Sequence, residues 1–249
     1  MPEPEELTMD EYRVRSRRSV LTGAAAMLGG YVGWRRLQDS AADHNIPGVL
    51  RDVHETNESI WSTLFRDDHQ AKTFGRADAS ILQVNGFQGM RNDIDLATWQ
   101  LNVLGPDGER LGAHSLADIQ ALPMHEMTIQ HKCIEGWAQV TNWSGARFSD
   151  FMDLYADRLP DDITDVYLAT PDDRYYVSVD LATMRHQQTL LAYQMLDQPL
   201  DDAHGAPLRL ATPLKYGIKQ IKRIGSVQFR RDKGGDFWGE RGYDWYAGL

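Results

Sequence analysis

The sequence predicts an α+β domain, in which dispersed short strands are interrupted by a few short helices. The 249 residues are 42% hydrophobic and 25% charged, a composition typical of a chain that buries a sizeable core. Runs with strand character recur along the whole chain, whereas helical spacing is confined to isolated segments. The strands and helices do not alternate regularly and no internal repeat is visible, which argues against an α/β fold with a parallel sheet.

Strands are predicted where short apolar or alternating runs end at turn residues. These predicted strands span 81–84, 98–104, 127–131, 166–170, 175–179, 208–212 and 224–230. Helices are predicted over 115–122, 148–159 and 184–195. The first of them is capped by Ser115, and the second stops at Pro160. Together these elements predict a main domain over 81–249, and the polar residues 43–80 are expected to add an amino-terminal extension of short helices.

The segment 1–42 predicts an export signal or a membrane tether. Arg17 and Arg18 are followed by an apolar stretch, 20–34, and this arrangement resembles a twin-arginine signal. The stretch is shorter than the roughly 20 apolar residues of a membrane span. Cleavage at Ser40-Ala41-Ala42 and an uncleaved tether both remain open. Because the twin-arginine route exports folded proteins, the signal predicts a cofactor inserted before export and a periplasmic or other extracytoplasmic location.

The charge of the chain excludes one class of partner. The formal net charge is -10. Nucleic-acid binding needs lysine and arginine clustered against phosphates, so no nucleic-acid partner is expected.

Cys133 is the single cysteine of the chain, so an internal disulfide is impossible. A lone cysteine is most often a buried core residue, but the neighbours of this one indicate a use for the thiol. Lys132 and His131 favour the thiolate, which is a soft ligand suited to molybdenum. Gly136 permits unusual backbone geometry beside it, and Trp137 can wall a pocket. Two alternatives remain open: a zinc site that uses His125 and His131, and a nucleophilic cysteine–histidine pair.

The segment 204–224 is a candidate anion site, because it holds five lysines or arginines and no acid in an acidic chain. Arg209 can grip a phosphate with two parallel hydrogen bonds, and Lys219 and Lys222 can add point charges. The alternative is a solvated basic strand and turn. Further along, the aromatic and glycine-rich stretch 237–246 is expected to pack on the core, although it could also line a site entrance.

These motifs carry a resemblance to a known family. The runs His-Lys-Cys-Ile-Glu-Gly-Trp at 131–137, His-Gly-Ala-Pro-Leu-Arg at 204–209 and Lys-Tyr-Gly-Ile-Lys-Gln-Ile-Lys at 215–222 stand in the order and spacing of the sulfite-oxidase superfamily. The resemblance covers about residues 81–249. Within this superfamily the chain is most similar to the periplasmic molybdenum-dependent methionine-sulfoxide reductases.

The resemblance implies a sulfite-oxidase-type molybdopterin-binding fold, built of mixed sheets with short helices, and a Mo-molybdopterin cofactor. It implies that Cys133 is the thiolate ligand of the metal and the catalytic cysteine. It assigns the binding of the pterin and its phosphate to a set of further residues: Asn85, Thr170, His204, Arg209, Gln220, Ile221 and Lys222.

The implied reaction is a two-electron oxygen-atom transfer, with a small oxide or sulfoxide as the substrate to be reduced. The arginine-rich run that follows the cysteine in sulfite oxidases is replaced here by Glu135 and Trp137, which disfavours sulfite. The reductase group has asparagine where this chain has His204. No Cys-x-x-Cys-His haem motif is present, so a membrane cytochrome or another separate carrier is expected to exchange electrons with the enzyme. The alternatives are a sulfite-type dehydrogenase and an exported binding protein that has the fold without catalysis.

Overall fold

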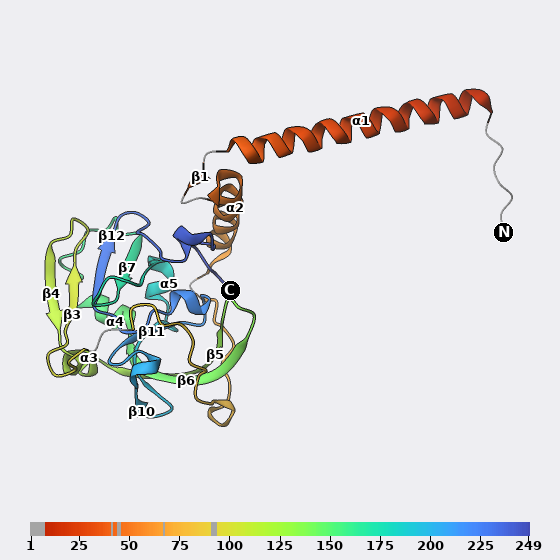
Figure 1. Ribbon diagram of the computed structural model, residues 1–249. Coiled ribbons are helices and arrows are strands. Elements are labelled where there is room, and N and C mark those ends of the chain that lie inside the picture. The colour runs from red at the N-terminus through yellow and green to blue at the C-terminus, as the bar shows by residue number, and fades with distance from the viewer. Residues whose placement is uncertain (1–7, 41, 44–45, 67, 91–93) are drawn as a thin grey trace. The chain divides into compact units, whose positions relative to one another are not determined.

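The structure is a computed structural model that describes residues 8–40, 42–43, 46–66, 68–90 and 94–249 (Figure 1). It divides into two compact units, Met1–Val53 and His54–Leu249. The first unit contains helix α1 (Met9–Asp39) and the short antiparallel pair β1 (Ala42–Asp43) and β2 (Ile46–Pro47). Helix α2 (Gly48–Leu64) follows directly after β2.

Helix α1 contains Arg17, Arg18 and the apolar stretch 20–34 of the predicted export segment. It begins with a capping box in which the side chains of Thr8 and Glu11 satisfy each other's backbone N–H groups. All of its residues are exposed to solvent. No helix in the described part of the chain is both long enough and apolar enough to cross a membrane. Ala41, in the candidate cleavage site, lies outside the described residues.

The second unit is built on two five-stranded sheets, which Figure 1 shows as separate layers. One sheet is antiparallel and has the order β10-β9-β6-β5, with β11 also paired to β9. Its strands are β5 (Met124–Lys132), β6 (Ala138–Arg147), β9 (Leu190–Met195), β10 (Gln198–Pro199) and β11 (Arg209–Ala211).

The other sheet has the order β4-β3-β12-β7-β8 and is mixed, because β12 runs parallel to β3 and antiparallel to β7. Its strands are β3 (Leu101–Leu104), β4 (Arg110–His114), β7 (Asp165–Ala169), β8 (Tyr176–Asp180) and β12 (Ser226–Arg230).

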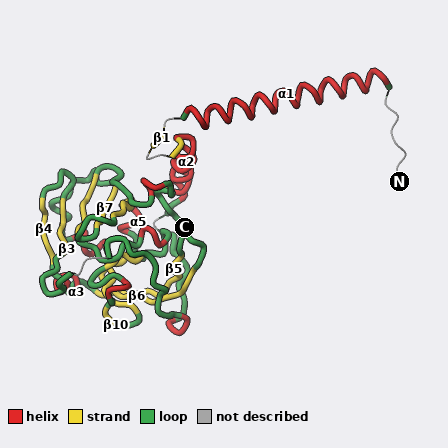
Figure 2. The backbone as a smooth tube through the Cα atoms, viewed as in Figure 1, coloured by secondary structure: helices red, strands yellow, loops and turns green. Residues whose placement is uncertain are grey.

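Short helices and long loops connect the strands, as Figure 2 shows in red and green. The α-helices are α3 (Leu116–Gln120), α4 (Phe148–Asp153) and α5 (Leu181–Arg185), and the 3₁₀ turns are η1 (Arg76–Asp78), η2 (Asp202–His204), η3 (Gly217–Lys219) and η4 (Gly239–Arg241). Mixed sheets with few short helices confirm the predicted α+β class.

Two hydrophobic clusters hold these layers together. The larger cluster lies between the sheets and includes Leu101, Phe148, Leu191 and Val227, all fully buried. The smaller cluster covers the other face of the β5-containing sheet and includes Trp143, also fully buried. This sheet is therefore buried on both faces, which fixes its strands as a rigid support for the loops that leave their ends.

The predicted helix over 184–195 is wrong. The chain forms the short helix α5, which ends at Arg185, and then the strand β9. Leu191 and Tyr193 of this strand pack into the larger cluster, whereas Leu190 and Ala192 pack into the smaller one. A strand buried on both faces has no polar alternation, so periodicity does not separate it from a buried helix.

The predicted strand over 81–84 is also wrong, because these residues are in irregular structure. Side-chain bonds replace a backbone ladder at this place: the Gln139 amide accepts from the Gln83 N–H at 2.8 Å and donates to the Ile81 carbonyl. The segment therefore follows β6 without joining its sheet, and it leads Asn85 toward the end of β5.

Candidate functional site

A cavity opens where three parts of the chain meet: the end of β5, the 204–222 segment and the aromatic stretch after β12. Five of the eight residues expected to hold the cofactor line this cavity, namely Asn85, Cys133, Arg209, Gln220 and Lys222. They come from segments far apart in the sequence. The fold therefore brings the predicted cysteine and the predicted anion site into one cavity.

Cys133 directly follows β5 and opens a tight turn. Its N–H donates to the Trp137 carbonyl at 2.9 Å, and its carbonyl accepts from the Gly136 N–H at 3.0 Å. Gly136 has a φ of 94°, in the left-handed region that glycine adopts without strain. The cysteine is only 7% exposed, yet it lines the cavity. The turn therefore holds a shielded thiol at the cavity wall.

Glu135 stands beside the thiol at the cavity wall. The Asn85 amide nitrogen lies 3.6 Å from the Cys133 Sγ and donates to Glu135 Oε2 at 3.0 Å. Trp137 Nε1 donates to the same carboxylate oxygen at 3.2 Å. Two donors from different segments thus fix a carboxylate next to the cysteine.

Arg209 is a buried cation for which the described residues supply no carboxylate partner. It is 1% exposed, and its terminal nitrogens donate to the carbonyls of His204 and Gln220 at 3.1 and 3.3 Å. The guanidinium lies over the Trp143 ring, 4.5 Å from the centroid. Its Nε has no hydrogen-bond partner among the described residues. Burial lowers the pKa of Arg209 to about 9, because no negative charge compensates the lost hydration.

Lys222 is the second cation of the cavity. Its Nζ donates to the carbonyls of Asn85 and Ala203 at 2.7 and 2.8 Å, and no ion pair to a carboxylate is found for it in the described part of the chain. Burial and, to a smaller extent, the nearby charge of Arg209 lower the pKa of Lys222 to about 8, while the charge of Asp201 acts in the opposite direction. Two cations in one cavity, neither of them ion-paired with a carboxylate of the described residues, are a strong indication of an anionic ligand.

Gln220 ties this cationic wall to β5. Its side-chain oxygen lies 3.2 Å from His131 Nδ1, and its amide nitrogen donates to the Lys215 carbonyl at 3.2 Å. Burial lowers the pKa of His131 to about 4, and the charge of Arg209 acts in the same direction, so the ring is neutral at pH 7. The neutral ring can donate from Nδ1 to the Gln220 oxygen and keep that side chain in place.

Three residues expected at the cofactor do not line the cavity. Thr170 is 1% exposed, and its hydroxyl bonds Asp172 at 2.7 Å. His204 bonds the Asp201 carboxylate at 2.6 Å and the Leu82 carbonyl at 2.8 Å. Ile221 is fully buried in the larger hydrophobic cluster. Their side chains support the segments that form the wall.

Aromatic side chains form the remaining wall, and the sequence only partly indicated them. Trp137, Tyr175, Trp238 and Tyr243 line the cavity. The stretch 237–246 was expected to pack on the core, with lining of a site entrance as the alternative. It does both: Phe237 packs against the Tyr175 ring at a tilt, while Trp238 and Tyr243 line the cavity. Tyr175 had no signal in the sequence. It reaches the wall because its hydroxyl donates to the Ile218 carbonyl at 2.5 Å.

The zinc alternative finds no support. Within the described ranges, no three histidine, cysteine, aspartate or glutamate side chains gather into a group that could hold a metal ion. Predicted zinc ligand His125 instead pairs with Asp150 at 3.3 Å.

Comparisons with known proteins identify the family of the chain. The family described as "Oxidoreductase molybdopterin binding domain" matches residues 88–238. The chain is 34% identical over 237 residues to the putative protein-methionine-sulfoxide reductase subunit YedZ1 of Azospira oryzae, which covers 93% of this chain and 86% of that protein. The chain belongs to the molybdopterin-binding oxidoreductase family.

Other relatives of this molybdopterin-dependent oxidoreductase include a methionine-sulfoxide reductase and a sulfite oxidase, which represent the two groups that the resemblance implied. The chain is 27% identical to the protein-methionine-sulfoxide reductase catalytic subunit MsrP of Campylobacter jejuni, over 93% of this chain and 79% of that one. It is 27% identical to mouse mitochondrial sulfite oxidase, over 62% of this chain and 33% of that one. The sulfane dehydrogenase SoxCD of Paracoccus pantotrophus has a similar fold, with a TM-score of 0.50, 16% identity and coverage of 57% of this chain and 40% of that one.

The cofactor of the family is Mo-molybdopterin, and the residues of the cavity fit it. The pterin carries a phosphate, and the cavity supplies the buried Arg209, whose Nε is without a partner, together with Lys222. The metal takes soft sulfur ligands, and the cavity supplies one shielded thiol at Cys133. Donor types and charge therefore match both ends of the group.

Proposed function

We propose that Cys133 is the protein's thiolate ligand to molybdenum and that Arg209 and Lys222 bind the pterin phosphate. Support comes from the chemistry of the cavity, which is lined by one thiol and by two cations that have no ion pair with a carboxylate of the described residues. Gln220 would orient this wall through His131. Thr170, His204 and Ile221 would act from behind the wall, and Asn85 would contact the cofactor beside the cysteine.

We further propose that the enzyme reduces a neutral sulfoxide of the methionine type rather than oxidising sulfite. The observation that carries this proposal is Glu135, which Asn85 and Trp137 fix beside Cys133. A carboxylate at this place repels an anion such as sulfite, because like charges a few ångströms apart in a partly dry site oppose binding. The aromatic wall of Trp137, Trp238 and Tyr243 suits an apolar thioether chain.

When bound, the molybdenum centre supplies the two-electron exchange of an oxygen atom with the substrate. The balanced reaction consumes the sulfoxide, two electrons and two protons, and it gives the thioether and water. The protein's own residues bind and orient: the aromatic wall excludes water and holds the substrate's alkyl chain, while Glu135 and Asn85 set the polarity at the thiol. Arg209 and Lys222 fix the far end of the cofactor, so that the reacting end stays at Cys133.

We also propose an extracytoplasmic location and a separate electron donor. Arg17 and Arg18 followed by the apolar residues of α1 support export by the twin-arginine route, with or without cleavage. The missing haem motif supports a separate carrier, such as a membrane cytochrome. A fusion of residues 1–42 to a folded reporter tests the route: export should stop when both arginines become lysine, and continued export would contradict it.

A substrate screen tests the proposed reaction. The metal-loaded protein would be given a reduced viologen dye with methionine sulfoxide, free and in a peptide, and separately ferricyanide with sulfite. We expect dye oxidation with the sulfoxide and none in Cys133→Ser, whose fold should persist because serine has nearly the same shape. Oxidation of sulfite without reduction of any sulfoxide would instead support the dehydrogenase alternative, and absence of molybdenum and pterin from the native protein would support a non-catalytic binding protein.

A further inference from the structure

Two buried lysines stand on either side of the turn that walls the cavity. Turn η3 contributes Gly217 and Ile218 to the lining, and Lys215 precedes it while Lys219 ends it. Both lysines are 1% exposed, and neither lines the cavity. Buried lysines of this kind are held by specific partners, and those partners decide where the turn lies.

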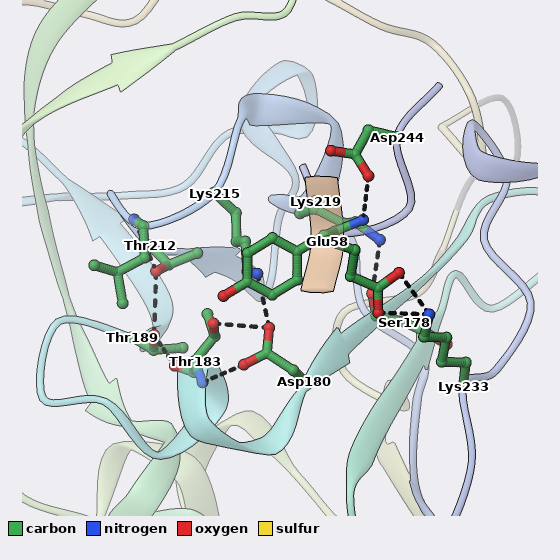
Figure 3. A network of polar contacts seen from close by, with 12 residues as sticks. Glu58, Ser178, Asp180, Thr183, Thr189, Thr212, Lys215, Lys219, Lys233 and Asp244 are labelled. Atoms are coloured by element: carbon green, nitrogen blue, oxygen red, sulfur yellow. Dashed lines mark hydrogen bonds and ion pairs between the residues drawn. The ribbon is translucent and has the colours of Figure 1, made fainter. Parts of the chain in front are cut away.

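Each lysine has one carboxylate partner and one aromatic partner. Lys215 pairs with Asp180 at 2.7 Å and lies 3.0 Å from the centroid of the Tyr246 ring. Lys219 pairs with Asp236 at 2.5 Å and lies 4.5 Å from the centroid of the Trp245 ring. Figure 3 shows both lysines in this network, with Asp180 beside Lys215 and Ser178 beside Lys219.

The aromatic partners belong to one short segment, Asp244–Leu249, which we call the tail. Its backbone is also bound to the segment before η3. The Tyr216 N–H donates to the Ala247 carbonyl at 3.0 Å, and the Leu249 N–H donates to the Leu214 carbonyl at 3.1 Å. The Asp244 carboxylate accepts from the Tyr246 N–H at 3.0 Å, which orders the tail itself.

The position of η3 matters for the cavity because the turn lies close against β5. A Cβ placed on Gly217 would come within 2.6 Å of His131 Nε2. Gln220, directly after the turn, bonds both His131 and the Lys215 carbonyl. A displacement of η3 would therefore move the wall that carries Gln220 and Lys222.

We propose that the tail is a latch that positions the 215–222 wall for the cofactor, with Trp245 and Tyr246 as positioning residues. Neither ring lines the cavity, so both act through the lysines that they cover. Trp245 is held in turn by Lys233, 5.0 Å from its centroid, and Lys233 pairs with Glu58 of α2 at 2.5 Å. The inference rests on the proposal that the cofactor occupies this cavity.

Trp245→Leu tests the latch, because leucine keeps an apolar side chain and removes the ring over Lys219. Two quantities would be measured on the full chain: hydrogen exchange of the Lys219 and Gln220 amides, and the rate at which the loaded protein loses pterin. We expect both to rise about tenfold, in line with the loss of a shielded cation–π contact. Trp245→Phe should restore most of the wild-type behaviour because it keeps a ring.

Phe74→Leu is the matched control. Phe74 is partly buried like Trp245, and it forms a cation–π contact with Lys72 at 4.9 Å, remote from η3. In Phe74→Leu, the hydrogen exchange of the Lys219 and Gln220 amides and the rate of pterin loss should equal those of the wild type. Unchanged rates in Trp245→Leu, or a rise spread evenly over η3 and strand β9, would overturn the latch. If the wild type binds no pterin, the proposed function fails, while the exchange comparison still decides whether the tail positions the turn.

Discussion

The basic segment of the chain contains buried and partly buried cations of two kinds, which differ in their partners. Arg209 and Lys222 line the cavity, and their hydrogen bonds within the described part of the chain go to backbone carbonyls. Lys215 and Lys219, from the same segment, each pair with an aspartate and lie outside the cavity. A cation that is paired with a carboxylate of the protein stabilises the fold. A cation without such a pair is available to bind an anionic ligand.

The largest effect on stability is expected from Lys219→Met. This change leaves Asp236 with a side chain only 2% exposed and without its cation, so the free energy of unfolding should fall by about 3–5 kcal/mol. Urea unfolding of the cofactor-free protein measures it. Adding Asp236→Asn, which removes the charge and keeps an acceptor for the Gly239 N–H, should restore more than half of the loss. A loss below about 1 kcal/mol in the single variant would refute the structural role of this pair.

Arg209→Met is expected to change the stability of the protein little and its pterin content strongly. Removing an uncompensated buried charge relieves its desolvation, and only two hydrogen bonds to carbonyls are lost, so unfolding should change by no more than about 1–2 kcal/mol. Pterin content per chain should fall below about a tenth, because a charge-assisted phosphate contact is lost. Leu101→Ala, which truncates a fully buried side chain of the larger hydrophobic cluster, is the control for a general loss of stability. A loss of unfolding free energy as large as that of Lys219→Met would show that Arg209 stabilises the fold rather than binding the ligand.

The pH dependence of anion binding tests the proposed role of the cations that line the cavity. Sulfate is a suitable probe because its charge is constant over the range. The pKa of Lys222 is lowered to about 8 in the cofactor-free protein, so sulfate affinity should fall as pH rises through 8, by up to about tenfold per unit. Titration calorimetry between pH 6.5 and 9 measures this. Lys222→Met should bind more weakly, with a profile that is flat below about pH 8, because the pKa of Arg209 in the same cavity is lowered only to about 9. A slope below pH 8 in that variant would assign the titration to a group other than Lys222.

In the absence of an anion, the stability of the protein should depend on pH in the opposite direction. The folded pKa of Lys222 lies below its ordinary value of 10.5, so between about pH 8 and 10.5 the unfolded chain holds more protons than the folded one. Stability therefore rises with pH across this window, and saturating sulfate should reduce the rise.

The smallest effect is expected from Glu58→Gln. The pair with Lys233 is partly solvated, since the lysine side chain is 49% exposed, and such pairs contribute less than about 1 kcal/mol. Thermal unfolding should change by no more than a few degrees. A loss of stability as large as that of Lys219→Met would show that solvent exposure does not decide how much an ion pair stabilises this protein.

Much of the fold could be predicted from the sequence because several strands are short apolar or alternating runs that end at turn residues. Strands β5, β7, β8 and β12 lie within one to three residues of their predicted bounds. The errors occurred where local patterns were silent or misleading. Strand β9 is covered on both faces and reads like a helix, and residues 81–84 bond a side chain instead of a neighbouring strand.

Residues of the candidate site could be predicted where the residue type itself indicates the chemistry. A thiol beside Lys132 and a basic run without acids identified Cys133 and Arg209, and the fold places both on one cavity. The sequence could not separate Lys215 and Lys219 from Lys222, because their aspartate partners come from distant strands and loops. Tyr175 was missed for the same reason, since only tertiary packing brings it to Ile218.

The most direct test of the central claim is a crystal structure of the molybdopterin-loaded protein. The account predicts Cys133 Sγ bonded to molybdenum and the pterin phosphate within hydrogen-bond distance of Arg209 Nε and Lys222 Nζ, with Lys215 and Lys219 still paired with their aspartates. A phosphate bound elsewhere, with Arg209 Nε still without a partner, would contradict it.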